Sequence, residues 1–337
     1  MNIENINRTL NRFKLLALLA DNENKLISGS YLAKKLNLTR QSIFKHINAL
    51  KEEGLKIDSI PQKGYKIPLL LQIDAMSPTF INYLLKENDL FHTCLSFDET
   101  DSTQTVIKKL AIAGASQGIV ATADYQNSGR GRSGRTWVNS KGNNLMFSIL
   151  LRPKLLPGNI QLLNLAVGLA IRTVLVSEYS LNADLKWPND ILINDKKVCG
   201  ILSEVAGEPD KIYYAITGIG LNVNMQKHDF CVEIEKIATS ILIESGKNIS
   251  RPYLLVNILN KLSSTVKLLE TPEGLKKILK SYKESCATLG KEVIVSQGKE
   301  THTGTATDIT EQGALVVKIN GKDMLFFAAD IKHLRIK

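Results

Sequence analysis

Hydrophobic residues in the first part of the chain recur with the spacing of amphipathic helices. The pattern predicts three helices, over residues 8–20, 28–37 and 40–54. Thr39 is a candidate N-cap for the third helix, and Gly54 is a residue at which helices commonly end. Because only a tight turn at Asn37 and Leu38 precedes this cap, the segment predicts a helix-turn-helix. Two short alternating runs around residues 61–64 predict a hairpin, or wing, directly after it.

The third predicted helix has one face for packing and another for contact. Ile43, Ile47 and Leu50 fall on one side of the helix at about 100° per residue. Polar side chains on the other side can read base edges and phosphates in a DNA major groove. The residues predicted to contact DNA, with one from the wing, are Arg40, Gln41, Lys45, Asn48 and Lys63. A three-helix packing or protein-binding module is the alternative interpretation.

The remainder of the chain mixes helix and strand patterns and ends in β structure. Helices are predicted at residues 102–115, 159–180 and 251–285, and strands at 118–125, 143–153, 184–193, 196–205 and 212–224. From residue 291, short β runs separated by glycines suggest a small SH3-like barrel. The sequence therefore predicts a multidomain α+β protein. Its expected parts are a winged helix-turn-helix at 1–66, a mixed α/β domain at 67–285 and the SH3-like barrel at 286–337.

The positive charge of the chain is unevenly distributed. Residues 1–66 contain 12 Lys and Arg against 6 Asp and Glu, so their net charge is +6. This is more than half of the net charge of +10 that the whole chain carries. A basic excess confined to a small segment is typical of nucleic-acid binding. The polar N-terminus and the lack of a long apolar run predict a cytoplasmic protein with no membrane partner. Four widely separated cysteines predict reduced thiols rather than a disulfide framework or a zinc site.

The most unusual segment is GRGRSGRTW, residues 129–137. Glycine leaves a backbone free to move, and arginine presents donors suited to carboxylates and phosphates, so we expect a mobile loop that orders around an anion. Its glycines formally match GxGxxG, but a strand rather than a helix is predicted to follow, which argues against a Rossmann dinucleotide site. The chain also lacks GxxxxGK[ST], which excludes a P-loop enzyme.

Two further motifs lie downstream. In KWPND, residues 186–190, the proline stiffens the backbone beside Lys186, as a positioned charge would require. A lysine that merely ends an edge strand is the alternative. In GIGLN, residues 218–222, two glycines within a predicted strand suggest the close approach of a ligand or of another backbone. A simple β-bulge would explain them equally well.

Taken together, six motifs resemble those of the biotin protein ligases in order and spacing. They are DSTQ (101–104), DYQ (124–126), GRGRSGRTW, KWPND, KVCGILSE (197–204) and GIGLN. With the N-terminal helix-turn-helix, the whole chain resembles the bifunctional bacterial form, in which a ligase and a biotin-operon repressor share one polypeptide. The sequence departs from the family in small ways, such as Ser133 where some relatives carry arginine.

The resemblance implies a two-step reaction. Biotin and ATP form biotinyl-5′-AMP and diphosphate, and a lysine of a biotin carboxyl carrier protein domain then displaces AMP. A carboxylate must approach a polyphosphate, so a cationic clamp is needed, and Arg132 and Lys186 are the predicted catalytic residues. Mg²⁺ is expected to arrive with ATP, and no metal-ligating residue is assigned. No tightly bound prosthetic group is expected.

The resemblance also assigns binding roles residue by residue. The residues expected to bind biotin or biotinyl-AMP are Ser102, Thr103, Gln104, Gln126, Gly129, Arg130, Gly131, Arg132 and Lys186. Those expected near the nucleotide are Lys197, Gly218, Gly220 and Asn222. Trp137 and the strand at 200–202 could form an apolar wall for the thiophane ring. Asp190 is available as the base for the carrier lysine, although a structural role is the alternative.

The expected partners are the carrier domain, biotin operator DNA and a second copy of the chain when biotinyl-AMP is bound. Three other functions remain open from the sequence. They are a ligand-sensing transcription factor without ligase activity, a lipoate-type ligase on the same catalytic fold, and a ligase whose N-terminal module is only structural.

Overall fold

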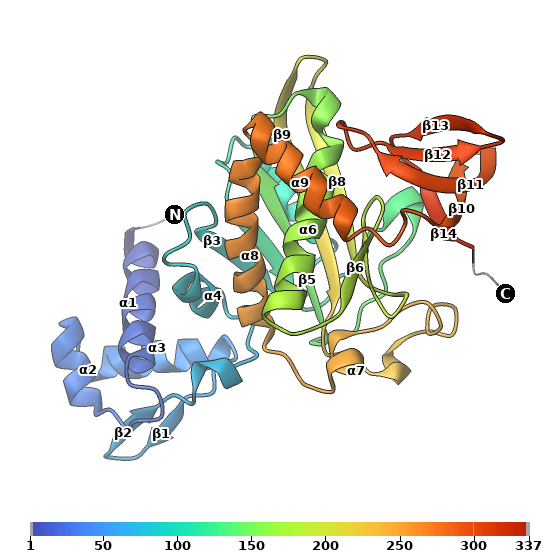
Figure 1. Ribbon diagram of the computed structural model, residues 1–337. Helices are drawn as coiled ribbons and strands as arrows, with labels where there is room; N and C mark the ends of the chain where they lie inside the picture. The colour runs from blue at the N-terminus through green and yellow to red at the C-terminus, as the bar shows by residue number, and fades with distance from the viewer. Residues whose placement is uncertain (1–2, 299, 335–337) are drawn as a thin grey trace.

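The computed structural model describes residues 3–298 and 300–334, and its N-terminal part is the predicted winged helix-turn-helix (Figure 1). Its elements are α1 (Ile3–Ala20), α2 (Gly29–Leu36), α3 (Arg40–Glu52), β1 (Asp58–Ile60) and β2 (Gly64–Lys66). The Ser28 and Thr39 hydroxyls cap α2 and α3, and Asn37 ends α2 in the left-handed conformation. Helix α1 begins at residue 3 rather than at the predicted residue 8.

The core of this part continues past residue 66. Ile67, Leu70 and Ile73 pack with it, as do Phe80 and Tyr83 of helix α4 (Pro78–Leu84). The turn η1 (Leu70–Gln72) lies in this connection. The proposed boundary between residues 66 and 67 stays a prediction, as does that between residues 285 and 286. Residues 1–2, 299 and 335–337 of the predicted outer domains lie outside the described part of the chain.

A polar junction also ties the third helix to α4 and the central part of the protein. Glu53, at the C-terminal end of α3, accepts hydrogen bonds from Arg12 Nη1 of α1 (2.7 Å) and Ser77 Oγ (2.5 Å). It also accepts from the backbone N and the hydroxyl of Thr79 in α4, at 3.2 and 2.9 Å. Farther along, Arg251 is 5% exposed and donates to both Asp74 and Asp124. The helix-turn-helix is therefore fixed to the central part by packed side chains and ionic contacts.

The centre is a seven-stranded sheet in the order β3-β4-β5-β9-β8-β7-β6 (Figure 1). Its strands are β3 (Thr93–Phe97), β4 (Ile119–Ala123), β5 (Asn144–Leu151), β6 (Ala183–Lys186), β7 (Asp190–Ile193), β8 (Lys196–Glu208) and β9 (Lys211–Asn222). Strands β3 and β4 are parallel, and the other neighbours are antiparallel. The predicted strand over 184–193 is in fact the hairpin β6–β7, because residues 187–189 form its turn. The hydrophobic pattern did not single out α4, β3 or the short helix α7 (Ile241–Ser245).

Helices cover both faces of this sheet. Helices α6 (Gln161–Ser177), α8 (Arg251–Leu268) and α9 (Pro272–Glu284) lie over the face seen in Figure 1. Helix α5 (Thr103–Ile112) packs on strands β4, β5 and β9 through a separate core that contains Ile107, Ala121 and Ile216. The segment Pro157–Ser177, which includes α6, is long and apolar enough to cross a membrane, but most of it is buried inside the protein. Its apolar composition is explained by this burial.

The C-terminal part is a five-stranded antiparallel sheet in the order β13-β12-β11-β10-β14. Its strands are β10 (Glu292–Gln297), β11 (Glu300–Ile309), β12 (Leu315–Ile319), β13 (Lys322–Phe326) and β14 (Asp330–His333). Two contacts join it to the centre through Trp187, a fully buried residue of the β6–β7 turn. Its Nε1 donates to the Gly313 carbonyl (3.0 Å), and its backbone N donates to the Thr288 hydroxyl (3.1 Å). The KWPND motif therefore lies at the joint between these two parts.

Candidate functional site

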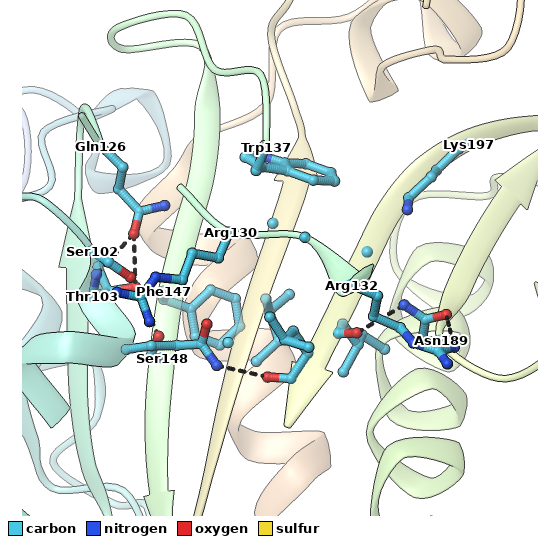
Figure 2. Close-up of a pocket in the computed structure, with 18 residues that line it drawn as sticks. Ser102, Thr103, Gln126, Arg130, Arg132, Trp137, Phe147, Ser148, Asn189 and Lys197 are labelled. Carbon is cyan, nitrogen blue, oxygen red and sulfur yellow. Dashed lines mark hydrogen bonds between the residues drawn. The ribbon is translucent and has the colours of Figure 1, made fainter. Parts of the chain in front are cut away.

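A cavity of about 50 Å³ lies on the α5 face of the sheet, beneath the loop of residues 129–137 (Figure 2). It is lined from α5, β5, β8, β9, this loop and the β6–β7 turn. The lining residues are Ser102, Thr103, Gln104, Gln126, Arg130, Gly131, Arg132, Trp137, Phe147, Ser148, Asn189, Lys197, Gly200, Ile201, Leu202, Gly218, Ile219 and Gly220. Segments far apart in the sequence, one of them the arginine–glycine loop, therefore meet at one site.

Glycines form the floor of the cavity, and their lack of a side chain leaves room for Trp137 and Gln104 to pack directly against the strands. Gly200 of β8 and Gly220 of β9 are opposite each other in the sheet. A Cβ atom on Gly220 would lie 2.4 Å from the Trp137 ring, and one on Gly218 would lie 2.7 Å from the Gln104 side chain. Ligand pockets usually enclose about 300–1,000 Å³. A ligand of substrate size therefore requires Trp137 or its loop to move away from the floor.

One end of the cavity is a hydrogen-bonded polar cluster at the start of α5. The Gln126 Oε1 atom accepts from the Thr103 backbone N at 2.8 Å, and the Thr103 hydroxyl lies 2.7 Å from the Ser148 hydroxyl. The Gln104 Nε2 atom donates to the Leu202 carbonyl (2.9 Å). Ser102 is the N-cap residue of α5, and its side chain makes no capping hydrogen bond. These groups are buried, so a polar ligand placed here would meet preformed donors and acceptors.

The arginine–glycine loop is folded into a narrow turn in this structure. Gly131 N donates to the Arg135 carbonyl, and Trp137 N donates to the Gly129 carbonyl. Ser133 and Gly134, at the tip, have positive φ values of 55° and 74°. The indole Nε1 of Trp137 is buried and has no hydrogen-bond partner among the described residues, a state that proteins usually avoid.

Arg132 points from this turn toward the KWPND segment. Its Nη1 atom donates to Asn189 Oδ1 (3.1 Å), and Asn189 Nδ2 in turn donates to the Ile201 carbonyl (3.0 Å), as Figure 2 shows. Burial lowers the pKa of Arg132, although the guanidinium stays charged at neutral pH. A half-buried cation held by a neutral amide remains available to an anionic ligand.

Lys186 and Lys197 occupy the neighbouring edge of the site. Burial lowers the pKa of Lys186, which is opposite Asp190 in the β6–β7 pair. Asp190 Oδ1 lies 2.7 Å from Lys197 Nζ, so this carboxylate already has an ionic partner. Lys197 lines the cavity and lies 5.7 Å from the Trp137 ring centroid. The region therefore carries several cations, and the Asp190 carboxylate among them is already paired.

A residue of the C-terminal part also contacts the loop. The Asp330 carboxylate forms an ion pair with Arg135 and lies 3.5 Å from the Ser133 hydroxyl. No sequence pattern signals this contact, because almost two hundred residues separate the partners.

The structure brings together most, but not all, of the residues predicted to form the site. Ten of them line the cavity, namely Ser102, Thr103, Gln104, Gln126, Arg130, Gly131, Arg132, Lys197, Gly218 and Gly220. Gly129, Lys186 and Asn222 are not among the lining residues. Asn222 is buried, and its side-chain amide accepts from Asn144 Nδ2 and donates to the Thr239 carbonyl. Asn189, Phe147 and Ser148 line the cavity without having been predicted; Asn189 could have been found, since it lies within KWPND.

The residues predicted to contact DNA lie in the helix-turn-helix as expected from the spacing. Arg40, Gln41 and Lys45 of α3 are exposed, Asn48 is half-buried, and Lys63 is exposed in the wing. Their role in DNA binding remains a prediction.

Comparisons with known proteins give the family of the chain. Residues 96–222 match the biotin/lipoate A/B protein ligase family, residues 11–66 an HTH domain, and residues 288–331 the biotin protein ligase C terminal domain. Over 325 residues the chain is 31% identical to the bifunctional ligase/repressor BirA of Bacillus subtilis, covering 96% of this chain and 99% of that protein. This chain belongs to the biotin protein ligase family.

Other biotin protein ligases support the same assignment. The chain is 30% identical to the bifunctional ligase/repressor BirA of Escherichia coli, over 91% of this chain and 92% of that protein. The biotin protein ligase from Aquifex aeolicus, solved in complex with biotin and ATP, is 31% identical with a TM-score of 0.63, covering 73% of this chain and 100% of that one. These matches confirm the predicted family. They also confirm the predicted fold class, in which a helix-turn-helix, a mixed α/β ligase domain and a small β domain follow one another.

The donors around the cavity do not suit a protein-held metal ion. They are guanidinium, ammonium, amide and hydroxyl groups, and the nearby carboxylate of Asp190 is paired with Lys197. Within residues 3–298 and 300–334, no group of three or more His, Cys, Asp or Glu is arranged to hold a metal. Mg²⁺ prefers carboxylates and phosphate oxygens, so we assign it no protein site among the described residues.

Proposed function

We propose that the protein is an ATP-dependent biotin protein ligase that acts in the cytoplasm and that also represses transcription through its helix-turn-helix. The observation that carries the ligase proposal is the cavity itself. It combines a glycine floor, a buried polar cluster and Arg132 on a loop that can cover a bound ligand. The relatives named as biotin ligases and the Aquifex aeolicus complex with biotin and ATP support biotin and ATP as the substrates.

In the first step, a carboxylate oxygen of biotin attacks the α-phosphorus of ATP, and the α–β anhydride bond breaks to release diphosphate. Both reactants are anions, so positive charge must hold them together and stabilise the transition state. Arg132 can supply this charge from the loop, together with Lys197, which also lines the cavity. Lys186 would act from the neighbouring edge, and its partial burial strengthens its interaction with a phosphate.

In the second step, the ε-amine of a carrier-protein lysine attacks the acyl carbon of biotinyl-AMP. An amide bond forms, AMP leaves, and the amine loses a proton. Before this step water must be excluded from the mixed anhydride, and a closed 129–137 loop provides that cover. Asp190 is a poor choice for the base, because Lys197 already holds its carboxylate.

The repressor proposal depends on the exposed polar face of α3 and the adjoining wing. A helix-turn-helix usually reads two half-sites as a dimer, so we propose that biotinyl-AMP promotes dimerisation and operator binding. A pure sensor and a lipoate ligase are disfavoured, because the curated relatives carry names of biotin ligases or ligase/repressors. A gel shift with operator-like DNA, with and without biotin and ATP, tests the coupling, and equal binding without ligand would contradict it.

The ligase activity is tested by transfer of labelled biotin to a carrier domain. Arg132→Ala and Lys186→Ala should each lower the rate about 100-fold, the usual cost of removing a transition-state donor. Lys154→Ala, which removes an exposed lysine outside the cavity, is the matched control. Wild-type protein that leaves the carrier unlabelled, or labels it equally well with lipoate, would overturn the proposal. Mg²⁺ would enter as the counter-ion of ATP, and its omission should abolish the first step.

A further inference from the structure

An arginine outside the cavity is almost completely buried. Arg251, the first residue of α8, is 5% exposed and is not among the residues that line the cavity. Burying a charged group costs free energy unless the group is paired and hydrogen-bonded. The reaction proposed for the cavity does not use this charge. Its partners therefore indicate what it holds in place.

The guanidinium of Arg251 joins segments that are far apart in the sequence. Its Nε atom donates to both carboxylate oxygens of Asp74 at 3.2 Å, and its Nη2 atom donates to the Asp74 carbonyl at 3.2 Å. Its Nη1 atom donates to Asp124 Oδ1 at 2.7 Å and to the Asn144 carbonyl at 3.4 Å. Asp74 lies between η1 and α4, Asp124 directly follows β4, and Asn144 begins β5. One side chain thus holds three backbone segments against the start of α8.

Asp124 is the first residue of the DYQ motif, and the rest of this motif reaches the cavity. Asp124 itself does not line the cavity. The next residue, Tyr125, accepts a hydrogen bond from Thr100 N at 3.1 Å through its carbonyl. Gln126 lines the cavity, and its Oε1 atom accepts from Thr103 N at 2.8 Å. The ion pair with Arg251 is therefore placed two residues before a side chain of the buried polar cluster.

We propose that Arg251 is a positioning residue for biotin binding, which acts through Asp124 to fix the DYQ segment and the Gln126 side chain. The proposal deepens the ligase function proposed for the cavity and rests on it. A hydrogen bond between two charged groups is about twice as strong as one between neutral groups. A binding group that is already held in place does not have to be ordered when the ligand arrives, which favours affinity. Asp74 ties the same guanidinium to the connection from the helix-turn-helix and provides the matched control.

The first test measures diphosphate release by the full-length protein at varied biotin and ATP concentrations. Asp124→Asn keeps the shape of the side chain but removes its charge, and it should raise the KM for biotin about tenfold. The kcat and the KM for ATP should change less than about twofold. Asp124→Glu restores the carboxylate and should recover most of the lost affinity. Asp74→Asn should leave the biotin KM unchanged, because the carbonyl of residue 74 still accepts from Arg251 Nη2.

A double-mutant cycle separates the Arg251–Asp124 contact from the rest of the cluster. Arg251→Lys keeps the charge but loses the planar fork, so it should also raise the biotin KM. Adding Asp124→Asn to Arg251→Lys should raise the KM by less than the product of the two single effects, because both changes remove one contact. A double variant that shows the full product would overturn the proposed route through Asp124.

The second test is amide hydrogen exchange in the ligand-free protein, which does not depend on activity. The amides of residues 126–128 are each hydrogen-bonded, and they should exchange faster in Asp124→Asn than in wild type or Asp74→Asn. Equal exchange in all three proteins, or an equal rise in biotin KM for both aspartate variants, would overturn the positioning role alone. Wild-type protein that neither binds biotin nor releases diphosphate would overturn the ligase function and this inference with it.

Discussion

Replacing Gly220 by alanine tests whether the glycine floor exists for ligand binding. A Cβ atom there would lie 2.4, 2.7 and 2.9 Å from three atoms of the Trp137 indole. Non-bonded carbon atoms are most favourable at about 3.5–4.0 Å. The indole must therefore withdraw by about 1 Å before the methyl group can be accommodated.

The cost of this substitution should appear mainly in the complex. In the free protein, the tip of the loop that carries Trp137 is exposed, so the ring can move with little loss of stability. When a ligand occupies the floor and the loop closes over it, the added methyl group overpacks the site by about 1–3 kcal/mol. This cost corresponds to a fall of about fivefold to 150-fold in kcat/KM for biotinyl-AMP formation.

The assay is the release of diphosphate at varied biotin and ATP concentrations, together with the melting temperature. Gly158→Ala is the matched control, because a Cβ at that position meets no atom within 4 Å. A Gly220→Ala variant with wild-type kcat/KM and an unchanged melting temperature would refute the placement of a ligand on this floor.

Contacts at the domain edges and in the loop lead to three more predictions. Burial lowers the pKa of His333, whose Nε2 lies 3.1 Å from the Thr288 hydroxyl, from 6.5 to about 4. Folding therefore disfavours the protonated form of His333, so the protein should be most stable above pH about 6.5 and lose stability as the pH drops toward 4. Melting temperatures measured across this pH range should fall less in His333→Gln than in wild type. Biotin should change the tryptophan fluorescence of wild type but not of Trp137→Phe, since the other tryptophan, Trp187, is fully buried away from the cavity lining. Glu53→Ala should destabilise the protein to urea by about 2–3 kcal/mol, because it leaves partly buried donors of α1 and α4 unpaired; a loss below about 0.5 kcal/mol would show that the junction contributes little.

Local sequence was sufficient for the features that depend on neighbouring residues. The spacing of Ile43, Ile47 and Leu50 determines which side of α3 is buried, and the Thr39 hydroxyl caps that helix as predicted. Six short motifs taken together, the arginine–glycine segment and KWPND among them, indicated the family. These signals are local because periodicity and capping act within one or two turns of chain.

Only the tertiary structure decided which residues meet. The contact of Trp137 with Gly220, the hydrogen bond from Arg132 to Asn189 and the ion pair of Arg135 with Asp330 join segments that the sequence separates by tens to hundreds of residues. Strand register also decided that the Asn222 side chain bonds to Asn144 and Thr239 in the interior and does not line the cavity. Such pairings depend on how strands align and which faces pack, and no local pattern encodes them.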